Sequence, residues 1–331
     1  MRRTIAGMIC LFLLWASSAE AGAARKKLRL AYAGWEVGTA VAYVGIDGNI
    51  FKKYDLDVEE VFIRDALTGG IQSLIGVDLV LGFGNPLAIF QPILEGSDIV
   101  FLGSHVSMEH YGMGVASEIR AIKDLKGKKV GVSALGGRSD LIARVILRRA
   151  GLNPLEDVQI VAAGLSPNRL VALSQNLIQG APLSPEVVSE AKGLGLKVLD
   201  MKAVPVTTAL LMTTRSLIRK DEEAVRRFVK GYSAAIHYYL THRTESISII
   251  KKYFSAADPN AIESMYELFA AQLQPLPAPD GEALQSLIDA VSVVDQRAKG
   301  LKPPDLFVLR FLEELKTSGF IHNLYTEKTS L

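Results

Sequence analysis

The sequence predicts an α/β protein with two lobes, each built on a doubly wound sheet, and with a ligand cleft between the lobes. Strands and helices alternate from Lys27 onward, and the alternation starts afresh in the middle of the chain. Lys27–Gly38 (KLRLAYAGWEVG) has a counterpart in Lys128–Ser139 (KKVGVSALGGRS), and Ser73–Pro86 has one in Asn176–Glu186. Two such halves place loops at the carboxyl ends of parallel strands, where a cleft would form. Chance similarity among strand-helix units is the alternative explanation.

The first half begins with an apolar strand. Lys27–Ala33 is followed by the loop GWEVG, and Thr39 can cap a helix that runs to about Lys53. Val58–Ile63 (VEEVFI) is the next predicted strand. Further helices are expected at Thr68–Ile75 and Leu87–Leu94, and further strands at Asp78–Leu81 and Ile99–Gly103.

The second half opens with Leu125–Asn153, the stretch in which we expect a binding site. Valines that alternate with small residues predict a short buried strand. Gly136 and Gly137 permit unusual backbone angles, and Ser139 is a good N-cap for a helix that begins near Asp140. Because the first N–H groups of a helix lack partners within it, they can hold a polar group of a ligand. The alternative is an ordinary strand-to-helix turn, since the loop matches none of GxxxxGK[ST], GxGxxG and GxSxG.

The segment Thr207–Thr214 (TTALLMTT) predicts a strand that brings the chain back to the first half. The remainder has the spacing of helices. These are expected at Asp221–Thr241, Ser246–Phe254, Asn260–Leu273, Gly281–Val294 and Leu306–Ser318. We therefore place lobe 1 at residues 28–110 together with 214–331, and lobe 2 at residues 111–213.

The N-terminus has the three parts of a secretory signal peptide, which we place at Met1–Ala21. Two arginines precede an apolar run that is too short to span a bilayer, and AEA forms a cleavage site that ends at Ala21. An uncleaved anchor is the alternative. Because the only cysteine, Cys10, lies in this segment, the mature chain would have no disulfide, thiol nucleophile or cysteine metal ligand.

The composition is that of a nearly neutral globular protein. The chain has 37 Lys and Arg against 35 Asp and Glu, with 49% hydrophobic and 7% aromatic residues. Without a basic cluster, no nucleic-acid partner is expected. The five histidines form no HExxH motif, so we expect no metal, no cofactor and no catalytic residue.

Four stretches of the chain resemble the periplasmic substrate-binding proteins of ABC transporters. They are LAYAGWEVG with GIDGNIFKKYDLDVE, LVLGFGNPLAI, DLKGKKVGVSALGGRSD and QGAPLSPE, within a likeness that extends from Arg29 to about Tyr325. The nearest branch is related to binders of nitrate, taurine, alkanesulfonates and thiamine-pyrimidine precursors. The likeness departs from that pattern in the Arg of GGRSD and in the absence of the acidic residue usual in the QGAPLSPE strand.

The resemblance implies a type II-like binding-protein fold in which two hinged lobes close on a small molecule. It also implies a periplasmic monomer that delivers its ligand to an ABC permease in the inner membrane, without catalysis. The alternative is an enzyme of the same fold that acts on an aromatic or quinone-precursor substrate. Thiamine-pyrimidine synthases of this fold use a cysteine-rich motif that the mature chain would lack.

The candidate ligand-binding residues lie in loops after predicted strands and at the starts of helices. They are Trp35, Glu36, Thr39, Asn85, Ser133, Gly136, Gly137, Arg138, Ser139, Asp140, Leu183 and Ser184. Trp35 can cover an apolar part of a ligand or simply pack, and Asn85 can contact a ligand or cap a helix. Arg138 can pair with an anionic ligand or remain solvated. Asp140 can complement the helix dipole or bind a cationic ligand.

We predict that the exported protein begins near Gly22, because the cleavage site follows directly after the apolar run. Mass spectrometry of the intact protein recovered from the periplasm measures this end. Recovery of a chain that still carries Met1 would contradict the prediction.

Overall fold

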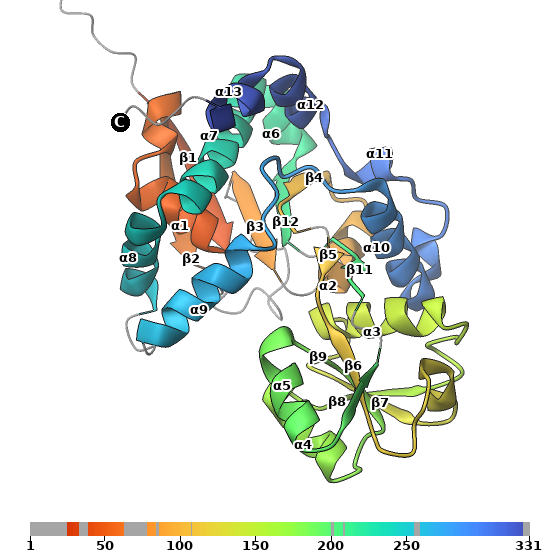
Figure 1. Ribbon diagram of the computed structural model, residues 1–331. Helices are drawn as coiled ribbons and strands as arrows, with labels where there is room; N and C mark the ends of the chain where they lie inside the picture. Colours follow the sequence, from red (N-terminus) through yellow and green to blue (C-terminus); the bar gives the residue numbers. More distant parts are fainter. Residues whose placement is uncertain are drawn as a thin grey trace, which may run out of the picture.

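The computed structural model describes residues 25–32, 39–62, 78–83, 86–106, 108–199, 202–207, 209–254 and 259–326. The predicted signal peptide and the candidates Trp35, Glu36 and Asn85 lie outside these residues. The described chain is an α/β structure with two five-stranded sheets and a two-stranded sheet, as Figure 1 shows. The α/β fold class predicted from the sequence is confirmed.

The first sheet has the order β2-β1-β3-β12-β4. Its strands are β1 (Lys26–Tyr32), β2 (Leu56–Phe62), β3 (Leu79–Phe83), β4 (Ile99–Ser104) and β12 (Ala209–Thr214). The second sheet has the order β10-β6-β9-β7-β8. Its strands are β6 (Gly112–Val115), β7 (Lys129–Val132), β8 (Gln159–Ala162), β9 (Gly180–Leu183) and β10 (Lys197–Leu199).

The chain crosses between the two sheets through β5 (Met108–Glu109) and β11 (Val204–Pro205), which pair with each other in antiparallel register. The first strand after each crossing runs against its neighbours: β6 is antiparallel to β9 and β10, and β12 is antiparallel to β3 and β4. The described helices of the first lobe surround the first sheet, whereas α4 and α5 cover the second (Figure 1).

Most of the predicted helices are present with local shifts. The described helices are α1 (Ala40–Asp47), α2 (Pro86–Leu94), α3 (Arg138–Arg149), α4 (Ser166–Ser174), α5 (Pro185–Gly193), α6 (Arg215–Lys220), α7 (Glu222–Thr241), α8 (Arg243–Tyr253), α9 (Pro259–Ala270), α10 (Gly281–Val294), α11 (Pro303–Leu306), α12 (Arg310–Thr317) and α13 (Phe320–Thr326). Of these, α4, α5, α6 and α13 were not predicted. The helix predicted at Leu306–Ser318 begins only at Arg310, and the one predicted at Thr68–Ile75 lies outside the described residues. The first helix was predicted to reach Lys53, but it ends at Asp47 because Asn49 takes a left-handed conformation (φ 54°). Among the described residues, no helix is both long and apolar enough to cross a membrane.

Strand β12 brings the chain back to the first sheet, as its sequence predicted. The boundary that we placed between residues 213 and 214 would assign most of this strand to the second lobe. Its pairing with β3 and β4 contradicts that assignment. The crossing segments β5 and β11 mark the change of sheet better, because each lies directly before the first strand of the sheet that the chain enters.

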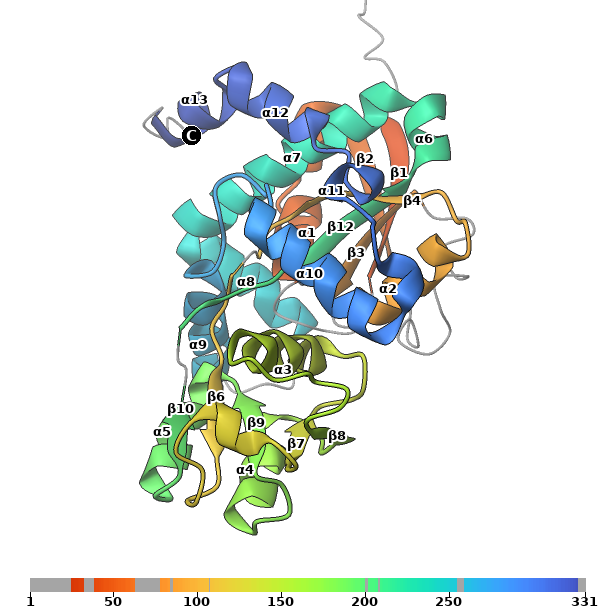
Figure 2. The same cartoon turned by 90° about the vertical axis from the view of Figure 1, so that its right-hand side faces the viewer.

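The two lobes share a hydrophobic core along helices α3 and α10. One buried cluster contains Phe101 and Met212 of the first sheet together with Val130 and Val132 of the second. Figure 2 shows α3 lying between the second sheet and the helices of the first lobe. At its C-terminal end, Arg148 pairs with Asp289 of α10 (3.2 Å) and Arg149 with Glu282 (3.0 Å). The second lobe is therefore held both at the β5–β11 crossing and along α3.

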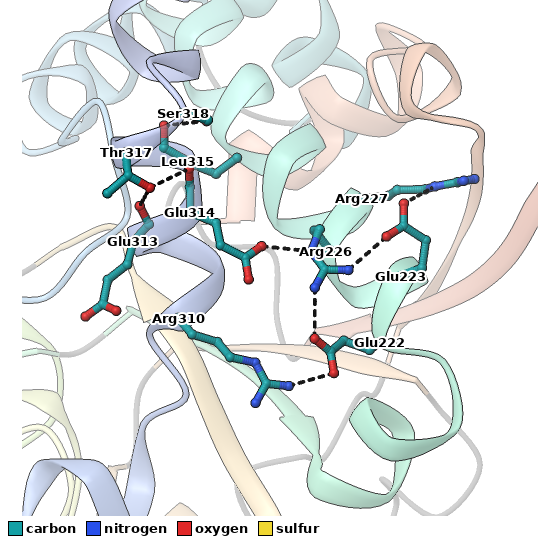
Figure 3. A network of polar contacts seen from close by, with 10 residues as sticks. All are labelled: Glu222, Glu223, Arg226, Arg227, Arg310, Glu313, Glu314, Leu315, Thr317 and Ser318. Carbon is teal, nitrogen blue, oxygen red and sulfur yellow. Dashed lines mark hydrogen bonds and ion pairs between the residues drawn. The ribbon is translucent and has the colours of Figure 1, made fainter.

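Helix α12, the last but one of the described helices, is joined to α7 by a network of surface charges (Figure 3). Arg226 contacts Glu314 of α12 (2.7 Å) as well as Glu222 and Glu223 of its own helix (each 2.8 Å). Arg310, the first residue of α12, also forms an ion pair with Glu222 (2.9 Å). Isolated exposed pairs contribute only about 0–1 kcal/mol, so the apolar contacts of Phe311 and Leu312 with the core stabilise α12 more.

We predict that Gly103→Ala lowers the free energy of unfolding by about 1–3 kcal/mol. A Cβ atom at Gly103 would lie 2.4 Å from the backbone oxygen of Pro277, in a turn that accepts a hydrogen bond from Ser104 N–H (2.9 Å). Gly193→Ala is the control, because nothing lies within 4 Å of its Cβ position. Urea denaturation should separate the two variants, and equal stability would show that the turn moves freely.

Candidate functional site

The carboxyl ends of parallel strands in both sheets lie beside the crossing segments. In the second sheet, Leu183 at the end of β9 pairs with Gly112, which begins β6 just after β5. In the first sheet, Phe83 at the end of β3 pairs with Ala209, which begins β12 just after β11. The loops that follow these strands therefore come together from opposite sheets, at the edges where α/β proteins commonly bind ligands.

The loop between β7 and α3 is closed by hydrogen bonds to side chains of the helix that it opens. Ser133 N–H donates to Ser139 Oγ (2.7 Å), and the Ser139 hydroxyl donates to Ser133 Oγ (2.8 Å). The helix begins at Arg138 with Gly137 as its N-cap, so the N-cap predicted at Ser139 is wrong. Ser139 instead holds the preceding loop, because its hydroxyl reaches back to the end of β7.

Of the two glycines in this loop, Gly136 is the one that the backbone requires. Its φ is +77°, in the left-handed region that a side chain disfavours. Gly137 has a φ of −77°, which any residue can adopt. A Cβ atom there would lie 3.1 Å from Ala134 O, so close packing rather than backbone conformation constrains Gly137.

Asp140 is directed into the protein. Its side chain is fully buried, and its Oδ2 accepts hydrogen bonds from Gly136 N–H (2.7 Å) and from Arg144 Nη2 (3.2 Å). Arg144 Nε also lies 2.9 Å from Asp140 Oδ1, so the two side chains form a buried ion pair one helical turn apart. In this arrangement the carboxylate stabilises the loop and is already matched by a cation. A contact between Asp140 and a cationic ligand is therefore not supported.

Arg138 is paired with a buried carboxylate at the crossing. Its Nε and Nη2 donate to Glu109 Oε1 (2.8 Å) and Oε2 (2.6 Å), and Glu109 is only 1% exposed in strand β5. The Arg138 side chain keeps 33% of its surface exposed and lies over the ring of Tyr111 (5.9 Å). The start of α3 is thus fastened to the crossing by a bidentate ion pair. Sequence reasoning missed Glu109, because a single Glu in a short strand carries no motif.

Arg169 organises the two neighbouring loops of the second lobe and was also missed. Its guanidinium is buried and donates to the carbonyl oxygens of Pro182 (2.9 Å) and Gly164 (2.7 Å) and to Ser166 Oγ (3.2 Å). Ser184 N–H donates to the same hydroxyl (2.9 Å). These bonds tie the loop after β8 to the loop after β9.

Ser184 and Leu183 take different positions. Ser184 occupies the N-cap position of α5 at the edge of the sheet, without a capping hydrogen bond from its side chain. Leu183 is fully buried in a cluster that includes Leu170, Leu173 and Val187. Leu183 has no exposed surface, so its predicted contact with a ligand is not supported.

Thr39 is the one candidate of the first lobe that lies within the described residues. It is buried at the start of α1, and its hydroxyl donates to the Tyr43 hydroxyl (2.5 Å). Tyr32 at the end of β1 packs edge-on against Tyr43 and donates to Glu60 Oε2 (2.6 Å). Burial, and then the bond to Glu60, raise the pKa of the Tyr32 hydroxyl far above its ordinary value, so it stays protonated as a donor.

We call the loops at these strand ends the rims of the two lobes. No group of three or more His, Cys, Asp or Glu side chains within the described part of the chain is arranged to hold a metal ion. The polar side chains at the rims mainly bond to backbone groups or to one another. They leave hydrogen bonding and shape as the chemistry that the rims can offer to a molecule between them.

Comparison with known proteins agrees with this architecture. The model of the family described as "NMT1/THI5 like" matches residues 37–246. A Haemophilus influenzae protein that is named for thiamine biosynthesis is 26% identical over 215 residues, which are 62% of this chain and 67% of that protein.

The chain is also similar to solved periplasmic binding proteins. The aliphatic sulphonate binding protein SsuA from Escherichia coli has a TM-score of 0.62 and 20% identity, over 84% of this chain and 94% of that one. The alkanesulfonate-binding protein SsuA from Xanthomonas axonopodis pv. citri, bound to MOPS, has a TM-score of 0.58 and 13% identity, over 85% of this chain and 98% of that one. At these identities the structures show the shared fold, and the two-lobed binding-protein fold predicted from the sequence is confirmed. Because the family model matches more than half of this chain, the chain belongs to the NMT1/THI5-like family.

Proposed function

We propose that this protein is the extracytoplasmic solute-binding component of an ABC import system and captures a small organic molecule between its two lobes by hinge closure. The observation that carries the proposal is the meeting of strand ends from both sheets beside the β5–β11 crossing. A pair of short segments is the only described backbone connection between the sheets, and hinges commonly consist of a few such residues. The binding-protein fold of the structural relatives supports a solute-binding role.

The ligand would contact both rims. From the second lobe, the start of α3 offers backbone N–H groups, and Arg138 and Ser133 offer polar atoms at its edge. Ser184 lies at the start of α5, on the neighbouring strand end. From the first lobe, Trp35, Glu36 and Asn85 remain candidates on the sequence argument alone. An apolar cover from Trp35 and polar anchoring at the helix starts suit a small molecule with one polar end.

The location, the partner and the absence of catalysis belong to the same proposal. Export by the signal peptide would place the monomer in the periplasm, where it would deliver its ligand to an inner-membrane permease. The thiamine biosynthesis name of the Haemophilus influenzae relative raises the possibility of an enzyme. The mature chain after residue 21 contains no cysteine, which argues against thiol chemistry and favours the binding role.

A ligand screen tests the function directly. The mature protein is heated in the presence of sulfonates, carboxylates, pyrimidines and aromatic acids, and each compound that raises the Tm is titrated calorimetrically. A binding protein should give a saturable ligand that is recovered unchanged and that makes the protein more compact in small-angle X-ray scattering. Conversion of the ligand to a product would contradict the proposal and favour an enzyme.

We predict that ligand changes the fluorescence of Trp35, the only tryptophan after the signal peptide. Replacement of Trp35 by Ala should weaken binding by about 1–3 kcal/mol, the contribution of a large aromatic side chain that covers apolar surface. Calorimetry with a ligand from the screen measures the loss, and an unchanged Tm without ligand is the control. Unaltered affinity would assign Trp35 to packing.

We predict that Glu109→Gln raises the affinity for anionic ligands about tenfold, or roughly 1.4 kcal/mol. The substitution removes the counter-charge of Arg138 and keeps a hydrogen-bond acceptor at a residue that is 1% exposed. Neutral ligands measure any loss that comes from the weakened pair, so the tenfold gain is expected in the ratio of anionic to neutral affinity. Arg138→Met in the Glu109→Gln background is the matched control, because it should abolish the gain. If Glu109→Gln kept the original ratio of anionic to neutral ligand affinity, Arg138 would not face the ligand.

A further inference from the structure

A cavity lies at the junction of helices α2, α3 and α10, beside the loop that precedes α3. Its volume is about 590 Å³, within the range of roughly 300–1,000 Å³ typical of small-molecule sites. Both lobes contribute to its lining: Leu135 and Gly136 come from the second, and Gln91 and Val294 come from the first. Strand β3 of the proposed ligand site leads into the start of α2, whereas this cavity lies against the second half of that helix. The cavity shares the loop before α3 with the proposed ligand site, through Gly136.

Part of the cavity lining is apolar. Leu94 and Val291 form the inner wall, and Val291 is 1% exposed as part of the core shared by the two lobes. Leu135 and Val294 also line the cavity, yet they are 59% and 51% exposed. Two large apolar side chains thus remain in water on opposite lobes beside one cavity. An apolar molecule in the cavity would remove part of that surface from water.

The polar part of the lining contains an unused hydrogen-bond donor. Arg144 is 6% exposed and is held by Asp140 through Nε and Nη2, as described above. Nε and Nη1 of Arg144 are both buried without a hydrogen-bond partner among the described residues, because the contact of Nε with Asp140 Oδ1 is an ion pair without hydrogen-bond geometry. Nη1 is the one of the two that makes no ion pair with Asp140. A buried guanidinium N–H without a partner is destabilising, so an acceptor delivered from the cavity would be favourable.

The charges of the lining cancel in pairs. Asp140 forms an ion pair with Arg144. Asp295 forms one with Arg297, whose Nη2 lies 2.6 Å from Asp295 Oδ2. A bound anion would therefore meet no uncompensated positive charge and would lie beside the carboxylates of Asp140 and Asp295. A neutral acceptor can use Arg144 Nη1 without that penalty.

We propose that this cavity is a second binding site, which takes a neutral, mostly apolar small molecule with a hydrogen-bond acceptor such as a carbonyl group. The acceptor bonds to Arg144 Nη1 after a small shift of the side chains around it, and the apolar body lies against Leu94, Leu135 and Val294. Because the lining comes from both lobes, the occupant also holds α3 against α2 and α10.

Three probes of similar shape test the site in the full mature protein. Benzamide has a ring and a neutral acceptor, benzoate has an anionic acceptor, and ethylbenzene has no acceptor. NMR titration should give saturable binding of benzamide with a Kd of about a millimolar or tighter, with shifts at Leu135 and Val294. Benzoate should bind at least fivefold more weakly. Tighter binding of benzoate, or no saturable binding of benzamide, would overturn the proposal.

Two kinds of variant locate the probe. Val294→Trp should fill the mouth of the cavity and weaken benzamide at least tenfold, whereas Leu268→Trp, at a residue on α9 that is 43% exposed, should leave it unchanged. Arg144→Lys keeps the charge beside Asp140 but removes the guanidinium donor. It should weaken benzamide at least fivefold and leave ethylbenzene unaffected. Equal losses of benzamide and ethylbenzene affinity in Arg144→Lys would overturn the role of Arg144. Unchanged benzamide affinity in Val294→Trp would overturn the site.

Discussion

The bidentate pair between Glu109 and Arg138 is the interaction on which the arrangement of the binding rim depends. Glu109 lies in β5, where the chain crosses between the sheets, and its carboxylate is almost completely buried. A buried carboxylate must keep a charged partner, because an unpaired charge in the interior is strongly destabilising. Arg138 supplies the partner from the first residue of α3. The crossing and the start of this helix are therefore fixed to each other by the cost of separating two charges.

This constraint limits how the lobes can move. The second lobe is joined to the first not only at the β5–β11 crossing but also along α3, which shares a buried core and two ion pairs with α10. A closing motion that separated α3 from α10 would expose that core to water. Rotation about an axis through the crossing and α3 avoids this cost.

The polar side chains of the second rim act mainly on their own loops. Ser139 holds the end of β7, Asp140 holds Gly136, and Arg169 joins the loops after β8 and β9. Each bond satisfies a backbone N–H or C=O group that would otherwise need a hydrogen bond from a ligand. The loops are therefore ordered before any ligand arrives. Recognition can then depend on the shape between the rims and on a small number of exposed donors. Arg138 is the described candidate that retains both charge and exposure.

The sequence by itself determined the alternation of strands and helices, the return of the chain at β12 and the likeness to binding proteins, because these depend on local spacing and on the order of motifs. It also located the loop from Ser133 to Gly137 as a strand-to-helix junction at a sheet edge. The roles of individual side chains were decided only by the tertiary structure. Glu109 and Arg138 are 29 residues apart and Arg169 reaches Pro182 across two loops, so no local pattern relates them. Their partners are set by how β5, α3, α4 and β9 pack in the folded protein, and the pairing of charges at long range has no period that a sequence could display.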